Sequence, residues 1–537
     1  MKKTLLVCCG TGCIANGSLK VAAALREAIA AQNSDAVVET LIKKTGCNGF
    51  CENGPIVKVL PDDISYYRVR VKDAGEIIDS LAKTPVERLL YRDDAGTCVQ
   101  SQRENPFYKK QQKLVLKNIG EIDPLAIDDY LARAGYEALK KALTLPPDEI
   151  IAEVEKSGLR GRGGAGFPTG KKWRTAASYA SCPKYVVMNG DEGDPGAFMD
   201  RSLLEGDPHS ILEGIAICAL AIGAEEGFLY IRNEYSLALK NVKKALSDAV
   251  NAGILGGSIL GSGKSLRLNV VRGGGAFVCG ESTALMASIE GGVGEPRAKY
   301  IRSVEHGLWN QPTVLNNVET FANIPQIILQ GGEKFAAIGT EKSKGTKVFA
   351  LVGKIRRSGL VEVPMGTTLR EIIFEIGGGI PGNRAFKAVQ TGGPSGGCLP
   401  EALLDVPVDF DTLLDYGSMM GSGGMIVMDD RTCMVEVARY YVSFLANESC
   451  GKCTPCRECL KSLVKILTRI SEGQGAEGDL AAIENLCEIL AETALCGLGK
   501  SAANPVITTM KYFAAEYAEH IREKRCRAGV CGMGAGK

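Results

Sequence analysis

The spacing of apolar positions changes several times along the chain, and the first 85 residues alternate between short strands and helices. Some apolar runs there are short and bounded by turn residues, as strands are, whereas two stretches repeat their apolar positions with the period of a helix. The pattern predicts a β-α-β unit closed by a helix. Its expected strands are Thr4–Val7, Val37–Leu41, Ile56–Leu60 and a segment near Tyr67–Val71, and its expected helices are Leu19–Ala31 and Ala74–Leu81.

Residues 86–125 are charged, polar and less periodic, which indicates a connector. From about 126 to 340, apolar strands alternate with helices, and this alternation predicts a mostly parallel α/β sheet covered on both faces. The expected strands are Tyr185–Met188, Gly227–Ile231 and Leu266–Val271, and the expected helices are Ser210–Ile222, Ser236–Ala252 and Glu281–Ile289.

Two further units follow in the sequence. Residues 341–425 contain a hairpin-like pair of strands, a helix and glycine-rich turns, which is typical of a small α+β module. Residues 426–537 have the period of helices almost throughout. The hairpin is expected at Lys347–Gly353 and Gly359–Val363 with a helix at Thr368–Ile376, and the later helices are expected at Cys433–Ala446, Arg457–Glu472, Asp479–Thr493 and Pro505–Lys524.

Composition narrows the class of protein. The 537 residues have 45% hydrophobic content and a formal net charge of +1, which argues against a nucleic-acid surface. The longest apolar candidate for a membrane span, Ile211–Ile222, contains Glu213 and is too short. The first residues favour a strand over a signal peptide, so we expect a cytoplasmic chain without membrane insertion. In that compartment its nineteen cysteines would be metal ligands and core residues more than disulfides.

The most informative cysteines are Cys450, Cys453 and Cys456, followed forty residues later by Cys496. A C-x2-C-x2-C run with a remote fourth cysteine is the spacing that holds one [4Fe–4S] cluster. A zinc site is the competing interpretation, although zinc sites usually combine one close pair of ligands with a second close pair. Cys459, one turn beyond Cys456, could compete for a cluster corner. The spacing predicts a protein that transfers electrons.

Two other groups of ligands lie near the ends of the chain. Cys8 and Cys13, with Cys47 and Cys51, make two short pairs that suit a [2Fe–2S] cluster, with a zinc site as the alternative. Near the C-terminus, one imidazole and two thiolates follow one another, and with a fourth ligand they would make a Cys3His zinc site. The alternative there is a helix end with unrelated cysteines. These three residues are His520, Cys526 and Cys531.

Glycine-rich loops supply the candidate cofactor site. Residues 157–170 satisfy the G-x-G-x-x-G pattern, but a strand does not precede them, so alone the pattern is weak. Lys171 and Lys172 at the next helix would place cations beside backbone N–H groups that could hold a phosphate. A second loop, residues 272–282, lies between a strand and a helix, where open α/β sheets bind ligands. The acidic loop N-G-D-E-G-D-P-G at 189–196 could bind calcium, but beside phosphate-type loops it favours sugar hydroxyls.

Five motifs in order resemble a known family over nearly the whole chain. They are G-L-R-G-R-G-G-A-G-F-P-T-G, N-G-D-E-G-D-P-G-A-F, C-G-E-S-T-A-L, P-T-V-L-N-N-V-E-T and S-C-G-K-C-T-P-C-R. They resemble the flavin-binding NADH dehydrogenase subunit of respiratory complex I. They are still closer to the beta (diaphorase) subunit of NAD-linked, often electron-bifurcating, [FeFe]-hydrogenases and of NAD-dependent formate dehydrogenases.

The resemblance implies a multidomain α/β fold. It implies a thioredoxin-like [2Fe–2S] ferredoxin module at 1–85, a connector at 86–125 and a Rossmann-like FMN- and NADH-binding domain at 126–340. A β-grasp domain at 341–425 and a helical [4Fe–4S] bundle at 426–537 would follow. Cys433 is implied as the fourth ligand of the zinc site, because the hydrogenase relatives have such a site near this terminus.

The resemblance also assigns roles to residues, with hydride transfer occurring at the flavin and no catalytic side chain. Phe167 and Glu192 would lie near NADH. Asp194 and Ser282 stand where the respiratory form commonly has glutamates, which bears on the choice between NADH and NADPH. Ser282 still falls in the cofactor site, and the implied flavin-binding residues are Gly161, Gly163, Gly164, Gly166, Lys172, Asn189, Asp191, Gly280, Glu281, Asn316 and Asn317.

The implied function is hydride exchange between NAD(H) and FMN, followed by one-electron transfer through iron–sulfur clusters. The partners would be a hydrogenase or formate dehydrogenase subunit and a small thioredoxin-like [2Fe–2S] subunit, in a higher oligomer of a heterotrimer. One alternative is flavin-based electron bifurcation with NADH and ferredoxin. It is weakened because no ferredoxin domain follows Cys531. A second alternative is an iron–sulfur scaffold that has lost flavin binding.

Overall fold

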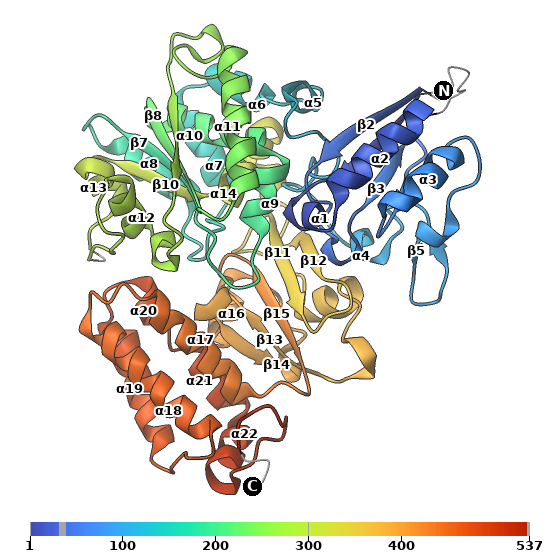
Figure 1. Cartoon of the computed structure of the whole chain (residues 1–537). Coiled ribbons are helices and arrows are strands. Elements are labelled where there is room, and N and C mark those ends of the chain that lie inside the picture. The colour runs from blue at the N-terminus through green and yellow to red at the C-terminus, as the bar shows by residue number, and fades with distance from the viewer. Residues whose placement is uncertain (1, 32–38, 299, 534–537) are drawn as a thin grey trace.

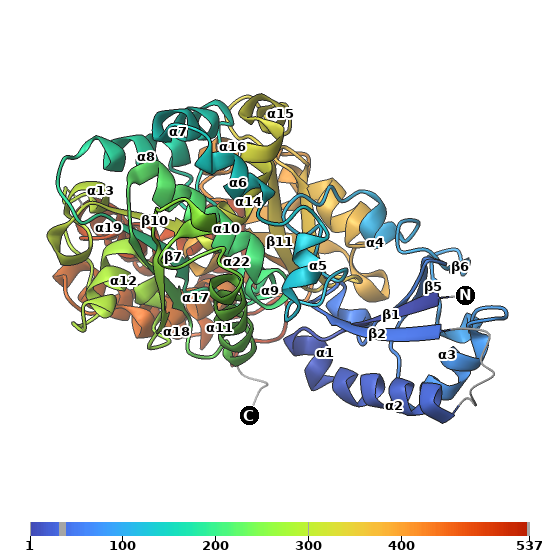
Figure 2. The same ribbon diagram turned by 90° about the horizontal axis from the view of Figure 1, so that it is seen from above.

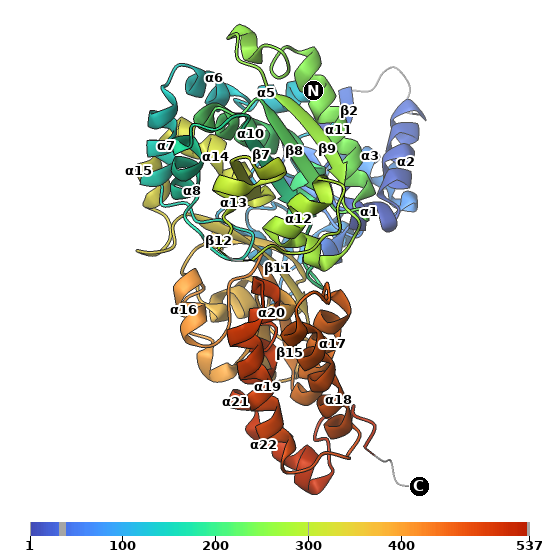
Figure 3. The same cartoon turned by 90° about the vertical axis from the view of Figure 1, so that its left-hand side faces the viewer.

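The computed structural model describes residues 2–31, 39–298 and 300–533. The central α/β domain and the C-terminal helices lie at opposite ends of the molecule with a smaller sheet between them, and the N-terminal module lies beside the central domain (Figures 1 and 3). No helix in these described ranges combines the length and the apolar character needed to cross a membrane.

The N-terminal module is a four-stranded mixed sheet in the order β2-β1-β3-β4. Strand β1 pairs in parallel with β2 and antiparallel with β3. The helices α1, α2 and α3 lie along one side of β1 and β2 (Figure 2). Its elements are β1 (Lys2–Cys8), α1 (Thr11–Ala15), α2 (Ser18–Ala31), β2 (Glu39–Thr45), β3 (Val57–Leu60), β4 (Ile64–Tyr66) and α3 (Ala74–Ser80).

Two predictions in this module need comment. The strand expected near Tyr67–Val71 is wrong, because the strand lies at Ile64–Tyr66 instead. Arg68 has a φ of 54°, in the left-handed region, and this ends the extended backbone. Of the strand expected at Val37–Leu41, the first two residues lie outside the described ranges.

The connector is tied to the rest of the molecule on both sides. Phe50 of the N-terminal module stacks on Phe107 with ring centroids 4.3 Å apart. The Glu362 carboxylate, in the smaller sheet, accepts the backbone N–H groups of three successive residues, 114–116. The connector elements are β5 (Tyr91–Arg92), β6 (Cys98–Val99) and α4 (Pro106–Lys109).

The central domain has a parallel sheet in the order β10-β7-β8-β9, as the alternation of strands and helices predicts. One face packs on α10 and α14, and the other on α12, so the sheet is covered on both sides. Every residue of α10 is buried, which explains why its sequence is apolar all round. The pattern did not predict β10 and α14 as elements.

The bounds of these elements are α5 (Ile127–Leu131), α6 (Glu137–Leu143), α7 (Pro147–Lys156), α8 (Thr169–Ser178), β7 (Tyr185–Gly190), α9 (Met199–Gly206), α10 (Pro208–Ile222), β8 (Glu226–Ile231), α11 (Ser236–Asn251), β9 (Arg267–Arg272), α12 (Ser282–Ile289), α13 (Ser303–His306), β10 (Thr313–Asn317), α14 (Val318–Gln330) and α15 (Gly332–Ala336).

The smaller sheet has five strands in the order β12-β11-β15-β13-β14. The hairpin β11–β12 is antiparallel, whereas β15 returns to pair in parallel with β11 at the centre, as in a β-grasp fold. β15 extends four residues past the expected boundary at 425. The elements are β11 (Thr346–Gly353), β12 (Gly359–Pro364), a helical segment (Glu371–Ile376), β13 (Phe386–Thr391), β14 (Gly397–Pro400), α16 (Phe410–Asp415) and β15 (Gly424–Asp429).

The C-terminal part is helical, as expected, but its last helix is not continuous. The single helix expected at Pro505–Lys524 is wrong, because Phe513 leaves the helical region with φ −128° and ψ 33°. The helices are α17 (Met434–Glu448), a π-helical turn (Pro455–Cys459), α18 (Leu460–Ser471), α19 (Asp479–Thr493), α20 (Gly497–Ser501), α21 (Asn504–Tyr512), α22 (Ala514–Ala518) and a last turn (Glu519–Glu523).

Candidate functional site

The glycine-rich loop between α7 and α8 folds against the end of β10. Gly161 N–H donates to the Phe167 carbonyl oxygen at 2.9 Å, which closes the loop on itself. A Cβ added to Gly163 would lie 2.9 Å from the Cβ of Asn317, so only glycine permits this close approach. Gly166 has a φ of 62°. The loop is therefore held as a fixed cradle beside β10.

The carboxyl ends of parallel strands bring three further segments to the cradle. Asn316 and Asn317 end β10 in register with Met188 and Asn189 of β7. The Asn189 amide then donates to the carbonyl oxygen of Gly280 at 2.9 Å. The predicted loops around residues 161, 189, 280 and 316 thus meet at one edge of the sheet, where open α/β sheets bind ligands.

Two buried polar side chains at this edge have no hydrogen-bond partner among the residues that the structure describes. Both amide atoms of Asn316 and both carboxylate oxygens of Asp191 are buried without a hydrogen bond. Burial raises the pKa of the Asp191 carboxyl to about 7. Because an unsatisfied buried polar group destabilises a fold, such groups in a glycine cradle fit a polar ligand such as FMN.

The raised pKa of Asp191 predicts how the stability of the flavin-free protein depends on pH. The folded protein keeps a proton on Asp191 that the unfolded chain releases above pH 3.8, so stability is highest below that pH and falls as the pH rises to about 7. We expect Asp191→Asn to match the wild type near pH 4. At pH 8 it should be more stable by about 2–4 kcal/mol. Thermal unfolding across this pH range measures the difference, and equal pH profiles for the two proteins would contradict it.

The acidic side chains beyond Asp191 are engaged inside the protein. Glu192 accepts the backbone N–H groups of Asp200 and Arg201, each at 3.1 Å, and the hydroxyl of Tyr235 at 3.0 Å. Asp194 accepts a hydrogen bond from a serine hydroxyl in the loop before β15, and burial raises its pKa to about 6. These carboxylates therefore fix the loop that follows β7.

Lys172 does not extend to solvent as a phosphate-binding cation would. Its ammonium donates to the Leu315 carbonyl oxygen at 2.8 Å, and burial lowers its pKa to about 8. Phe167 is 48% exposed at the mouth of the loop. Glu281 caps α12, accepting the N–H groups of residues 283 and 284. The Ser282 hydroxyl donates to this same carboxylate.

The cysteines with [4Fe–4S] spacing gather beside this edge. Ser449 Oγ lies 3.2 Å from Cys456 Sγ, in the loop and turn that lead from α17 to α18. Cys496 precedes α20, and burial raises its pKa although the nearby backbone N–H groups of residues 498 and 499 act to lower it. A Cβ on Gly499 would lie 3.6 Å from Cys456 Sγ. Burial raises the pKa of Cys456 to about 11, and Cys450, Cys453 and Cys496 add to this through space, so the four side chains are neighbours.

A direct contact joins these cysteines to the cradle. Glu448, two residues before Cys450, accepts the Phe277 backbone N–H at 2.8 Å, and Cys450 itself packs against the apolar cluster that contains Val278. Cys459 lies near Cys487, whose thiol pKa is raised by burial and, to a smaller extent, by Cys459. The structure thus brings Cys450, not Cys459, to the cradle.

The N-terminal cysteines also meet. The Sγ atoms of Cys47 and Cys51 lie 3.6 Å apart. Cys8 ends β1, and the nearby thiols of Cys13 and Cys47, together with burial, raise its pKa well above the usual value. A Cβ on Gly54 would lie 2.5 Å from Cys13 Sγ, so the backbone packs tightly on this group. Two thiolate pairs in contact provide two ligands for each iron of a [2Fe–2S] cluster.

A third group of ligands forms at the C-terminus. Cys433 Sγ and Cys531 Sγ lie 3.5 Å apart, and each is 3.4 Å from His520 Nε2. Cys526 completes the set, with all four donor atoms within 4.8 Å of one another. His520 Nδ1 bonds to the Glu516 carbonyl oxygen at 2.7 Å, which directs Nε2 to the thiols.

Three residues that position the cradle escaped the sequence analysis. Asp200 accepts a hydrogen bond from Asn317 at 2.5 Å, Tyr235 holds Glu192, and Glu448 holds the loop at 277. Asp200 follows the acidic motif by a few residues and could have been included with it. Tyr235 and Glu448 lie far from their partners in sequence, and no local pattern indicates them.

Comparisons with known proteins agree with this geometry. A thioredoxin-like [2Fe–2S] ferredoxin model matches residues 1–82, the Nuo51 FMN-binding domain matches residues 154–326, and the NADH-ubiquinone oxidoreductase-F iron–sulfur binding region matches residues 436–520. Fold and site together define the class of flavin- and iron–sulfur-containing oxidoreductase subunits.

Individual relatives identify the family. The chain is 55% identical over 423 residues to the NADP-reducing hydrogenase subunit HndC of Solidesulfovibrio fructosivorans, covering 79% of this chain and 86% of the relative. It is 46% identical over 416 residues to the F 2 subunit of NADH-quinone oxidoreductase from Rhizobium meliloti (strain 1021), covering 77% and 99%. A crystal structure of NAD+-reducing [NiFe]-hydrogenase in the H2-reduced state matches with a TM-score of 0.68 and 29% identity, over 97% of this chain and 84% of that one.

The chain therefore belongs to the family of FMN-binding NADH dehydrogenase subunits that occur in NADH-quinone oxidoreductases and hydrogenases. It is an oxidoreductase subunit that acts on NADH, with FMN, a [4Fe–4S] cluster and a [2Fe–2S] cluster as cofactors. The expected fold class and family resemblance are confirmed.

Proposed function

We propose that the cradle at the ends of β7 and β10 holds FMN, and that Cys450, Cys453, Cys456 and Cys496 hold the [4Fe–4S] cluster that exchanges electrons with it. The observation that carries this assignment is the set of partnerless buried atoms on Asn316 and Asp191, next to the loop that Glu448 joins to the cysteines. When bound, FMN supplies the ability to take a hydride and release electrons singly.

The chain's own residues bind and orient the two reactants. Gly161 closes the loop through its N–H bond to Phe167, and the backbone of Gly163, Gly164 and Gly166 would line the flavin on this side. Gly280 and Asn189 would form the facing wall. Asn316 offers an amide and Asp191 a carboxyl that donates or accepts according to its proton. Asn317, Lys172, Glu281 and Ser282 act by fixing the backbone around the cradle. Phe167 and the loop held by Glu192 line the approach for NADH.

Nucleotide choice is part of the proposal. We assign NADH as the substrate, although the HndC relative is described as NADP-reducing. Asp194 is held in the loop after β7 by a serine hydroxyl, and its negative charge beside the approach for NADH would disfavour an added 2′-phosphate. Steady-state reduction of a viologen dye by the FMN-loaded protein tests this. NADH should support turnover with a kcat/KM at least tenfold higher than that of NADPH. If neither nucleotide supported dye reduction, the proposed function would be overturned.

We propose that the flavin domain comprises residues 126–340 and that electrons leave it through the other domains of the chain. In the module at 1–85, Cys8, Cys13, Cys47 and Cys51 would hold the [2Fe–2S] cluster. The β-grasp domain at 341–425 would have a structural role. A hydrogenase or formate dehydrogenase subunit and a small [2Fe–2S] subunit would complete an assembly built from heterotrimers. We place this assembly in the cytoplasm, because a reducing compartment suits so many unpaired thiols. Turnover with NADH in the absence of ferredoxin would exclude obligatory electron bifurcation.

We also propose a zinc ion at Cys433, His520, Cys526 and Cys531. Separations of 3.4–3.5 Å between the donor atoms of Cys433, His520 and Cys531 are close to the edges of the tetrahedron that zinc requires. The bond from His520 to Glu516 fixes the imidazole as such ligands usually are fixed. One cation would tie α17 to the last turn of the chain, which a structural zinc does.

The zinc proposal predicts a metal content that one substitution removes. We expect about one zinc per chain in the wild type and much less in Cys531→Ser, because three ligands hold zinc far more weakly. Melting of the C-terminal helices should move to lower temperature, while the flavin content stays unchanged. Elemental analysis of both proteins measures this. Cys182→Ser, at an exposed cysteine, is the control, and zinc retained by Cys531→Ser would contradict the assignment.

A further inference from the structure

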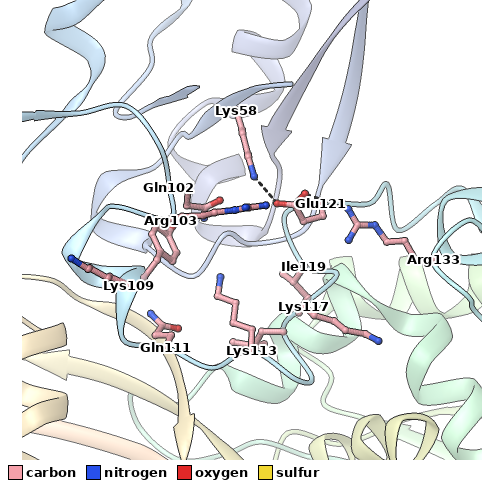
Figure 4. A pocket seen from close by; sticks show the side chains of 12 residues that line it. Lys58, Gln102, Arg103, Lys109, Gln111, Lys113, Lys117, Ile119, Glu121 and Arg133 are labelled. Carbon is pink, nitrogen blue, oxygen red and sulfur yellow. Dashed lines mark hydrogen bonds and ion pairs between the residues drawn. The ribbon is translucent and has the colours of Figure 1, made fainter. Parts of the chain in front are cut away.

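A cavity of about 520 Å³ lies where the N-terminal module, the connector and the central domain meet (Figure 4). Its lining contains six cationic side chains and one carboxylate, Glu121. Three separate parts of the chain supply the cations: Lys58 comes from β3, Arg103, Lys109, Lys113 and Lys117 come from the connector, and Arg133 follows α5.

The charges in this cavity are not balanced. Glu121 already pairs with both Lys58, at 2.9 Å, and Arg133, at 3.3 Å. Among the residues that the structure describes, the four connector cations form no ion pair. Lys113 lies over the ring of Tyr108, 4.6 Å from its centroid, and burial lowers its pKa to about 8. Carboxylates act on these lysines through space only, Glu362 and Glu121 on Lys113 and Asp207 and Glu213 on Lys117. The excess of cations in the lining therefore still favours an anion that pairs with them directly.

We propose that this cavity binds a small polyanion of the oligophosphate class, such as pyrophosphate or the phosphate chain of a nucleotide. Lysine and arginine together make charge-assisted hydrogen bonds to phosphate oxygens. The cavity has the size of a small-molecule site. Lys58 and Lys113 point into it from opposite sides, and Lys109 and Lys117 lie at its edge with their ammonium groups directed outward (Figure 4). This site is separate from the flavin cradle and independent of its assignment.

The cavity is connected to the loop that carries two [2Fe–2S] ligands. Asn48 lies between Cys47 and Cys51, and two lining residues hold it: Tyr108 OH donates to its carbonyl oxygen at 3.1 Å, and Gln102 donates to its side chain at 3.5 Å. A bound anion would join Lys58 of the ferredoxin module to Arg133 of the central domain. It would also make the addition of an electron to the nearby cluster less favourable.

Calorimetry on the FMN-loaded protein tests binding, with saturating NAD+ present so that the nucleotide site is filled. Tripolyphosphate should bind at one site, with an affinity that falls as salt rises. The double variant Lys113→Gln, Lys117→Gln should bind at least tenfold more weakly. A matched control removes two exposed lysines of α11, Lys240→Gln with Lys243→Gln, and should bind as the wild type does.

Three results would overturn the proposal: no saturable binding, equal binding by the Lys113/Lys117 double variant, or binding of ATP without binding of tripolyphosphate. Redox titration followed by EPR tests the link to the cluster. Tripolyphosphate should shift the reduction potential of the [2Fe–2S] cluster to a more negative value in the wild type and leave it unchanged in the double variant. An unshifted potential in wild-type protein with bound anion would refute the coupling.

Discussion

Replacing Cys453 with alanine should remove the [4Fe–4S] cluster while leaving the flavin reducible by NADH. Cys453 is only partly buried, and the hydrogen bond that joins this loop to the cradle is made by Glu448 with Phe277, which the substitution leaves in place. Iron should fall by about four atoms per chain, since a cubane with three thiolates is rarely retained. NADH should still bleach the flavin. Dye reduction through the cluster should fall at least a hundredfold.

Cys459→Ala is the matched control for this experiment. Cys459 is one helical turn from Cys456 and lies near Cys487, whose pKa burial and Cys459 together raise. This variant should keep its iron and its electron transfer. If Cys459→Ala lost the cluster and Cys453→Ala kept it, the ligand assignment would be wrong. If Cys453→Ala lost the flavin as well, the two sites would not be independent.

Asn316→Leu should have opposite effects on flavin binding and on the stability of the flavin-free protein. The amide of Asn316 is buried with neither atom paired, so it destabilises the empty fold and is available to a ligand. We expect FMN affinity to fall roughly 10–100-fold, which corresponds to two lost hydrogen bonds of about 1 kcal/mol each or slightly more. The flavin-free variant should unfold at the same temperature as the wild type or higher, because leucine has a similar size and no unsatisfied atoms.

Asn323→Leu provides the comparison for this variant. Asn323 is also buried, but its amide donates to the Glu319 carbonyl oxygen at 2.8 Å within α14. Its replacement should leave FMN affinity unchanged. Fluorescence titration with FMN and thermal unfolding of both variants are sufficient. Unchanged FMN affinity in Asn316→Leu would remove Asn316 from the flavin site.

Much of the fold could be predicted from the sequence because its signals are local. Helix α11 has a clear apolar period, α10 is a long apolar run and β8 is a short one, and the parallel sheet followed from their alternation. Failures occurred where backbone conformation or tertiary packing overrides local pattern. Arg68 turns the chain through a left-handed conformation, and Phe513 breaks an apparently continuous helix. Neither residue type signals such a change.

The candidate site was predictable to the extent that ligand spacing and glycine patterns are local. The pairing of Cys47 with Cys51, and of His520 with Cys433, followed from spacing and from the family resemblance. The role of Lys172 could not be predicted, because a lysine at a helix start is usually solvated, whereas here it donates to Leu315 of β10. The contact of Glu448 with Phe277 joins residues 171 positions apart, and only the folded chain brings them together.

The central claim is that this chain passes electrons from NADH through its flavin to its clusters. An anaerobic titration of the purified, FMN-loaded protein with NADH, followed by visible absorption and low-temperature EPR, tests it most directly. Flavin bleaching accompanied by signals of reduced clusters is the expected result. Clusters that respond to dithionite but not to NADH, in protein shown to retain FMN, would contradict the account.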